Sequence, residues 1–87
     1  MVTVINTHEV PDFDKWKEIF DASAEGRSRA GINILNVYCD VNNKNKVTVI
    51  SEVADAESAR AFIANLRPLL EKGAISQPEF MILEKVM

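Results

Sequence analysis

The only histidine of the chain, His8, is the side chain best suited to proton transfer. An imidazole with an unperturbed pKa of about 6.5 can accept or donate a proton near neutral pH. His8 ends a run rich in β-branched residues and precedes a predicted helix, which is where the mouth of a pocket would lie. We take His8 as the best candidate for a catalytic residue. The alternative is a structural histidine that bonds a loop carbonyl or faces solvent.

Later in the chain, Trp16 and Arg27 have side chains suited to holding a flat or an anionic ligand. Trp16 shares the inner face of a predicted helix with Phe13 and Phe20, and its large rigid ring can stack on a flat ligand. Arg27 carries a guanidinium fork that matches a carboxylate or a phosphate. The alternatives are an aromatic core stripe for Trp16 and a solvated loop arginine for Arg27.

Polar residues of a predicted hairpin form a third candidate group. Asn36 and Tyr38 lie two residues apart, so they share one face of a strand. If Tyr38 pairs near Val49 on the partner strand, Ser51 lies near Asn36. Asn36, Tyr38 and Ser51 then form a polar cluster within an otherwise apolar surface. Such a cluster either orients a ligand in an apolar pocket or hydrogen-bonds across a dimer interface.

The composition argues against several other chemistries. One histidine and one cysteine cannot build a typical transition-metal site, and three glycines form no glycine-rich phosphate loop. We therefore expect no metal and no cofactor. The net charge of −3, without a basic stripe, argues against nucleic acid as a partner. No apolar stretch approaches the roughly 18 residues of a membrane span, so no membrane partner is expected.

Cys39 is the single cysteine, so the chain cannot form an internal disulfide. A small domain without disulfides fits the cytosol, and we expect a cytoplasmic protein. Cys39 lies in an apolar strand and is predicted to be a small buried hydrophobic residue. Glu84, which has apolar neighbours, is the carboxylate that we expect to be partly buried.

The apolar periodicity predicts one α+β domain over residues 1–87, with the element order βαββαβ. This order favours a four-stranded antiparallel sheet with two helices on one face. The predicted elements are a strand at 2–8, a helix from 12 to about 26, a hairpin at 32–53, a helix from 55 and a strand at 79–86.

The helix ends are predicted from capping residues. Asp12 and Asp55 are expected to be N-caps, and Gly26 is expected to end the first helix. Pro68 is expected to interrupt the second helix, because the residue before a proline avoids the α region. A further short turn is then expected to run up to Gly73.

Both faces of the predicted sheet are apolar. In the second strand, Ile32, Ile34 and Tyr38 alternate with Leu35, Val37, Cys39 and Val41. Two-sided apolarity is typical of a sheet that is covered on both faces. The two helices cover only one of them, so the other face would be a large exposed apolar patch. We infer that a second copy of the chain covers this face, as a symmetric homodimer.

Several segments carry a resemblance to a known superfamily. They are residues 8–17, Phe20-Asp21, Gly31-Ile32, Ala59–Phe62 and Pro78–Phe80. Together they resemble small cyclase-like and antibiotic-biosynthesis-monooxygenase-like proteins of the dimeric α+β barrel superfamily, over essentially the whole chain. The resemblance implies a ferredoxin-like protomer whose sheet packs on a second protomer to form a β-barrel. It also implies a pocket between the sheet and the helices of each protomer.

Two classes of function remain open at this point. The first is a non-catalytic homodimer that binds a small apolar or aromatic ligand between sheet and helices. The resemblance implies the alternative, a cofactor-independent monooxygenase, or a cyclase or isomerase, acting on an aromatic or polyketide-like substrate. The haem-degrading relatives rely on a tryptophan and a histidine in the second half of the chain. This sequence has neither after residue 16, so haem degradation is not expected.

The position of His8 discriminates between these two classes. An enzyme would point His8 into a cavity together with Trp16, Asn36 or Tyr38. A binding module would fill that space with core side chains and leave His8 in water.

Overall fold

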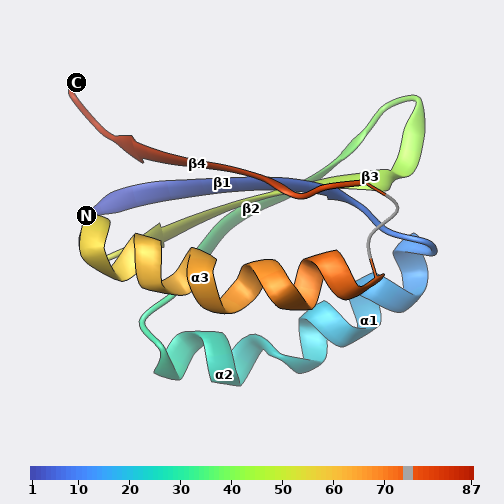
Figure 1. Cartoon of the computed structure of the whole chain (residues 1–87), viewed down its shortest axis with the longest axis horizontal. Coiled ribbons are helices and arrows are strands. Elements are labelled where there is room, and N and C mark those ends of the chain that lie inside the picture. Colours follow the sequence, from blue (N-terminus) through green and yellow to red (C-terminus); the bar gives the residue numbers. More distant parts are fainter. Residues whose placement is uncertain (74–75) are drawn as a thin grey trace.

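The computed structural model of the protein describes residues 1–73 and 76–87. Within these residues, four strands form one antiparallel sheet in the order β2-β3-β1-β4, and the helices lie together on one side of it (Figure 1). In chain order the elements are β1 (Val2–Glu9), α1 (Phe13–Ala22), α2 (Ala24–Arg29), β2 (Asn33–Asp40), β3 (Asn43–Val53), α3 (Ala56–Gly73) and β4 (Glu79–Glu84). The predicted α+β, ferredoxin-like arrangement is confirmed, with the first helix in two pieces.

The alternation of side chains along the strands gives the sheet two different faces. The helix face is the side covered by the helices, which lie below the sheet in the view of Figure 1. On this face β1 buries Val2, Val4, Asn6 and His8. The opposite side is the open face, which carries Thr3, Ile5 and Thr7 of β1, Asn36 and Tyr38 of β2, Thr48 and Ile50 of β3, and Met81 and Leu83 of β4. The chain supplies a cover for the helix face alone.

A small core of aliphatic side chains joins the helix face to α3. Its fully or nearly buried members are Val2, Val4, Val53 and Ala59, and Ile32, Phe62 and Ile63 pack against them. Burying a valine side chain contributes about 1.5–3 kcal/mol, so these few contacts hold α3 against the middle of the sheet. The core lies against the N-terminal half of α3. The C-terminal half of this helix faces the cavity described below.

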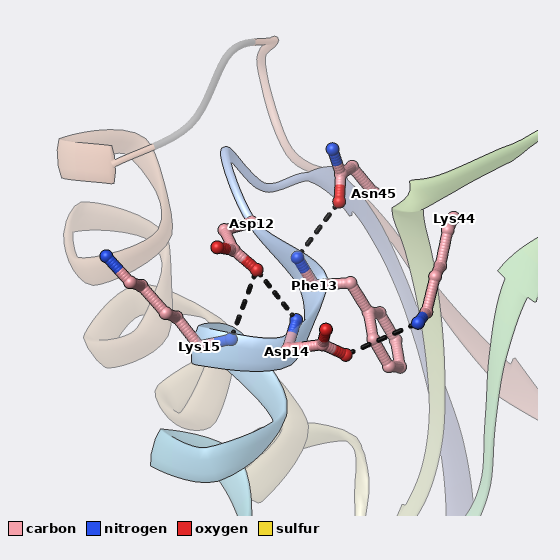
Figure 2. Close-up of polar contacts among 6 residues, drawn as sticks. All are labelled: Asp12, Phe13, Asp14, Lys15, Lys44 and Asn45. Atoms are coloured by element: carbon pink, nitrogen blue, oxygen red, sulfur yellow. Dashed lines mark hydrogen bonds and ion pairs between the residues drawn. The ribbon is translucent and has the colours of Figure 1, made fainter.

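The N-caps predicted for the two helices are confirmed. The Asp12 carboxylate accepts hydrogen bonds from the backbone N–H groups of Asp14, at 3.0 Å, and Lys15, at 3.4 Å (Figure 2). The Asp55 carboxylate accepts one from the N–H of Ser58 at 2.7 Å. Each cap satisfies donors that have no partner within the first turn of a helix.

The first helix does not run unbroken to Gly26, as the sequence predicted. It stops at Ala22, and α2 begins after a break at Ser23. The Ser23 hydroxyl donates to the carbonyl of Ile19 at 2.9 Å, a local bond that competes with regular helical geometry and bends helices. Gly26 lies inside α2, and the chain turns instead at Gly31, whose φ of +79° suits glycine.

The prediction that Pro68 interrupts the second helix is wrong. The α3 helix passes through Pro68 and reaches Gly73. Proline removes one N–H, which leaves the carbonyl four residues earlier, at Ala64, without its helical donor. Ala64 lies on the exposed side of α3, where water can satisfy that carbonyl. Directly before the proline, the guanidinium carbon of Arg67 lies 4.8 Å from the centre of the Phe80 ring of β4, a contact between the helix and the sheet.

Two predictions of burial on the outer strands are also wrong. Cys39, on β2, and Glu84, the last residue of β4, are both exposed. Both strands lie at an edge of the sheet, so their side chains lack a neighbour on one side. The last strand also ends at Glu84, two residues earlier than the predicted end at Val86.

Candidate functional site

A cavity of about 370 Å³ lies between the helix face and the three helices. Its floor comes from β1, β2 and β3, and its walls come from α1, α2 and α3. It is lined by Asn6, His8, Trp16, Ile19, Phe20, Ser23, Arg27, Ile34, Val49, Phe62, Leu66, Leu69 and Leu70. A mostly apolar lining with a few polar side chains is typical of sites for small organic ligands, and the volume lies within their usual range.

His8 lies in the floor of this cavity with only 4% of its surface exposed. Both ring nitrogens are buried and have no hydrogen-bond partner among the described residues. Burial lowers the pKa of His8 below its ordinary value of 6.5, because a charged imidazolium is poorly solvated there. The imidazole is therefore neutral at pH 7, with one nitrogen able to accept a proton or a hydrogen bond.

The aromatic side chains of α1 connect His8 to Arg27 in one continuous row. The rings of His8 and Trp16 meet edge to face at 5.9 Å, and Trp16 stacks on Phe20 at 4.9 Å. The guanidinium carbon of Arg27 then lies 3.8 Å from the centre of the Phe20 ring. The spacing of four residues between Trp16 and Phe20 places both rings on one side of α1.

A second hollow of about 310 Å³ adjoins the first. Five residues border both spaces: His8, Trp16, Ile19, Leu69 and Leu70. Ile19 and Leu69 are 68% and 70% exposed, so large apolar side chains face solvent on α1 and α3 where these helices flank the cavity. This side offers a small apolar molecule a route between the two helices.

The fold brings together three of the residues singled out from the sequence. His8, Trp16 and Arg27 all line the cavity of about 370 Å³. His8 therefore lies in a cavity beside Trp16, which is the position expected of an enzyme, and does not lie in water, the position expected of a binding module. Phe20, which was paired with Trp16 in the predicted aromatic stripe, lines the same cavity.

The predicted cluster of Asn36, Tyr38 and Ser51 is wrong. Asn36 lies opposite Ile50 and Tyr38 opposite Thr48, so both belong to the open face. Ser51 lies opposite Ile34 on the helix face, where its hydroxyl donates to the carbonyl of Val4 at 3.4 Å. The observed pairing differs by one residue from the predicted one, and a slip of one residue moves a side chain to the other face.

Asn6 lines the cavity and was not predicted as a site residue. It is only 3% exposed and lies two residues before His8 on β1. The signal was present in the sequence, because a period of two places Asn6 on the same face as Val4 and His8. An amide and an imidazole thus stand side by side in the floor of an otherwise apolar space.

Asn45 of β3 fixes the start of α1, and so the position of the aromatic row. Its side-chain oxygen accepts a hydrogen bond from the N–H of Phe13 at 2.9 Å (Figure 2), and its side-chain nitrogen donates to the carbonyl of Pro11 at 3.4 Å. Its backbone carbonyl accepts from Val10 at 2.8 Å. One residue of the sheet therefore holds the whole connection between β1 and α1.

Replacing Asn45 with alanine is expected to lower the free energy of unfolding by about 1–2 kcal/mol, since it removes a capping bond and a second side-chain bond. Urea denaturation followed by circular dichroism measures this change. Asn42→Ala is the matched control: Asn42 bonds Asp40 through its backbone N–H, which the substitution keeps. Equal stability of the two variants would contradict the role given to Asn45.

The described part of the chain offers no cluster of three or more His, Cys, Asp or Glu side chains that could hold a metal ion. Over residues 1–73 and 76–87, no helix combines the length and the apolar character that crossing a membrane requires.

Solved structures with this architecture match the chain over nearly its whole length. One is described as an antibiotic biosynthesis monooxygenase, with a TM-score of 0.73, 14% identity and full coverage of both chains. A candidate antibiotic biosynthesis monooxygenase from Bordetella bronchiseptica has a TM-score of 0.75 at 13% identity, covering 99% of this chain and 97% of its own. A conserved protein from Methanosarcina mazei Go1 has a TM-score of 0.64 at 20% identity, covering 97% and 91%.

The chain has the fold of these proteins. No protein-family model matches it, and no curated protein matches it. At 11–14% identity, the likeness to antibiotic biosynthesis monooxygenases concerns the arrangement of the backbone. The chemistry of the cavity therefore has to be argued from the side chains of this chain.

Proposed function

We propose that this protein binds a small, flat, largely apolar molecule in the cavity between its sheet and its helices. The observation that carries this proposal is His8, whose two ring nitrogens are buried beside Trp16 without a partner among the described residues. Buried polar atoms are nearly always hydrogen-bonded, so the imidazole favours a bound molecule that offers it a hydroxyl or a carbonyl. The apolar lining favours an aromatic ring for the rest of that molecule.

Binding of two naphthalene derivatives, 2-naphthol and 2-naphthoate, tests this proposal. In nitrogen-15 NMR spectra, at least one of them is expected to shift the indole signal of Trp16 and the ring signals of His8, and to leave Tyr38 unaffected. Leu66→Phe adds bulk inside the cavity and is expected to weaken binding about tenfold, the size of effect typical of steric misfit. Leu83→Phe makes the same change on the open face and serves as the control. If neither compound shifts these signals, the cavity is not a ligand site.

The neutral, unpartnered imidazole favours a second candidate function, acid–base catalysis on the bound molecule. A neutral His8 can take the proton of a ring hydroxyl at pH 7, which is also the kind of step expected of a cofactor-independent monooxygenase, a cyclase or an isomerase. The solved structures named for antibiotic biosynthesis monooxygenases support this candidate through their fold. Catalysed uptake of deuterium at the carbon next to the hydroxyl of 2-naphthol in D₂O would reveal such proton transfer.

We propose further that the protein is a homodimer joined through the open face. Tyr38, Met81 and Leu83 on that face are 54%, 52% and 42% exposed, and Ile5 and Ile50 pair between them at its centre. These side chains form an apolar row across all four strands, bordered by polar residues such as Thr7, Thr48 and Glu52, and an exposed apolar patch is typical of an interaction surface. A second copy is the natural cover, because a two-fold axis brings the same apolar patch of both chains together.

A further inference from the structure

Arg27 is the one charged residue that lines the cavity of about 370 Å³ among the residues that the structure describes. Its Nε is buried and lacks a hydrogen-bond partner in the same part of the chain. The ion pairs found over residues 1–73 and 76–87 join Lys17 to Asp21, Arg29 to Glu25 and Lys44 to Asp14. Arg27 therefore forms no ion pair among these residues, and its buried Nε–H is left without an acceptor at the wall of the cavity.

The surroundings of Arg27 favour binding of an anionic group at its guanidinium. Burial lowers the pKa of the Arg27 guanidinium, and the charge of Asp21 only partly offsets that effect. Arginine keeps its proton nonetheless, so its buried Nε–H remains a donor without an acceptor among the described residues, which costs free energy. Within apolar walls an ionic hydrogen bond is stronger than in water. A ligand that brings a negative oxygen to Nε would remove this cost.

The row of rings gives the rest of the ligand its shape. Arg27 lies over Phe20, Phe20 stacks on Trp16, and Trp16 meets His8. Arg27 and His8 thus lie at opposite ends of this row of rings. A rigid, planar ring system that lies beside the row loses little conformational entropy on binding.

Building on the proposed function, we infer that the ligand is a planar aromatic anion whose carboxylate or phenolate oxygen accepts a hydrogen bond from Arg27 Nε. The charge-assisted bond to Arg27 selects the anion, and the apolar walls select the ring. Without the Arg27 guanidinium, the cavity is expected to bind apolar molecules with no preference for an anionic one.

Calorimetric titrations with 2-naphthoate and 2-naphthol at pH 7 test this inference, because the two compounds share a ring system and differ in the group offered to Arg27. Wild-type protein is expected to bind the carboxylate about tenfold more tightly than the neutral phenol, given the strength of charge-assisted hydrogen bonds. Arg27→Gln is expected to remove the preference. Arg29→Gln is the control, since Arg29 belongs to the same short helix but pairs with Glu25 in solvent.

The absorbance of bound 2-naphthol distinguishes the two anions. If a phenolate is the natural group, the bound phenol ionises at a lower pH than the free phenol, and Arg27→Gln removes that shift. Equal binding of both compounds to the wild-type chain, with no shift in ionisation, would overturn the inference and leave the proposed function intact. Binding of neither compound would overturn both. The comparison of compounds in the wild-type chain stands even if the Arg27 variant fails to fold.

Discussion

Replacing His8 with phenylalanine is expected to raise the stability of the protein while weakening its binding of 2-naphthol. The phenyl ring keeps the apolar contact with Trp16 and removes two buried nitrogens that have no partner among the described residues. Unsatisfied buried polar groups cost about 1–3 kcal/mol each, so urea denaturation at pH 7 should show a gain of about 1 kcal/mol or more. The loss of a hydrogen bond to the ligand should weaken binding about tenfold.

The gain from His8→Phe is expected to grow as the pH falls. The pKa of His8 is lowered in the folded protein by burial, whereas in the unfolded chain it keeps its ordinary value of 6.5. Below pH 6.5 the unfolded chain therefore takes up a proton that the folded protein resists. The contribution of His8 to wild-type stability is thus fully present above pH 6.5 and is lost as the pH drops toward the lowered pKa. The phenylalanine variant lacks this loss.

Comparing the two proteins from pH 7.5 to pH 5 isolates this effect, because the chain has one histidine and its carboxylates are the same in both. A difference in unfolding free energy that widens toward acid pH supports the buried, neutral imidazole. A variant that is less stable than wild type at pH 7 would show that the ring nitrogens are bonded in the fold. His8 would then be a structural residue, and the second candidate function would lose its base.

Replacing Ile50 with lysine is expected to convert the proposed dimer into a monomer. Ile50 lies on a central strand, opposite Ile5 on one side and Asn36 on the other, in the middle of the open face. An unpaired ammonium buried at an interface costs several kcal/mol, so the dissociation constant should rise at least about a hundredfold. In the free protomer the same lysine would reach water, and the fold should survive.

Sedimentation equilibrium at micromolar concentration measures this change. Wild-type protein is expected at twice the protomer mass of 9.7 kDa, and Ile50→Lys at the protomer mass itself. Ala64→Lys is the matched control, since it adds the same charge on the exposed side of α3 and should leave the mass unchanged. A wild-type protein that sediments as a 9.7 kDa particle would contradict the dimer outright.

The order of the elements and the two faces of the sheet could be predicted because they follow from local periodicity. In β1, a period of two divides the residues into Val2, Val4, Asn6 and His8 on one side and Thr3, Ile5 and Thr7 on the other, and the structure buries the first set under the helices. The caps at Asp12 and Asp55 are equally local, because an aspartate reaches the N–H groups two or three residues ahead of it.

The errors arose where distant contacts override local preference. Pro68 disfavours a helix locally, but α3 continues through it along the sheet, where it contacts β1, β3 and β4. The break at Ser23 is a different case, because the bond of its hydroxyl to the carbonyl of Ile19 is local, and helical spacing of apolar residues does not reveal it.

The candidate site was predicted in part for the same reason. His8, Trp16 and Arg27 were recognised by residue type, and the fold places all three around one cavity. The cluster with Ser51 was predicted wrongly because the β2 residues that share its face depend on the register between β2 and β3, which shifts between Ile34 and Asn36. Such a bulge is set by the pairing of whole strands and leaves little trace in the sequence.

The position of Trp16 has a practical consequence, because it is the only tryptophan of the chain and it lines the cavity. Its ultraviolet emission comes from one indole, so the intensity and colour of that light report on whatever occupies the space beside it. A collection of unlabelled compounds, or fractions of a cell extract, can thus be screened for the natural ligand by measuring the intrinsic fluorescence of the protein. Where emission changes in the native chain but not in the Leu66→Phe variant, the compound responsible lies in the cavity.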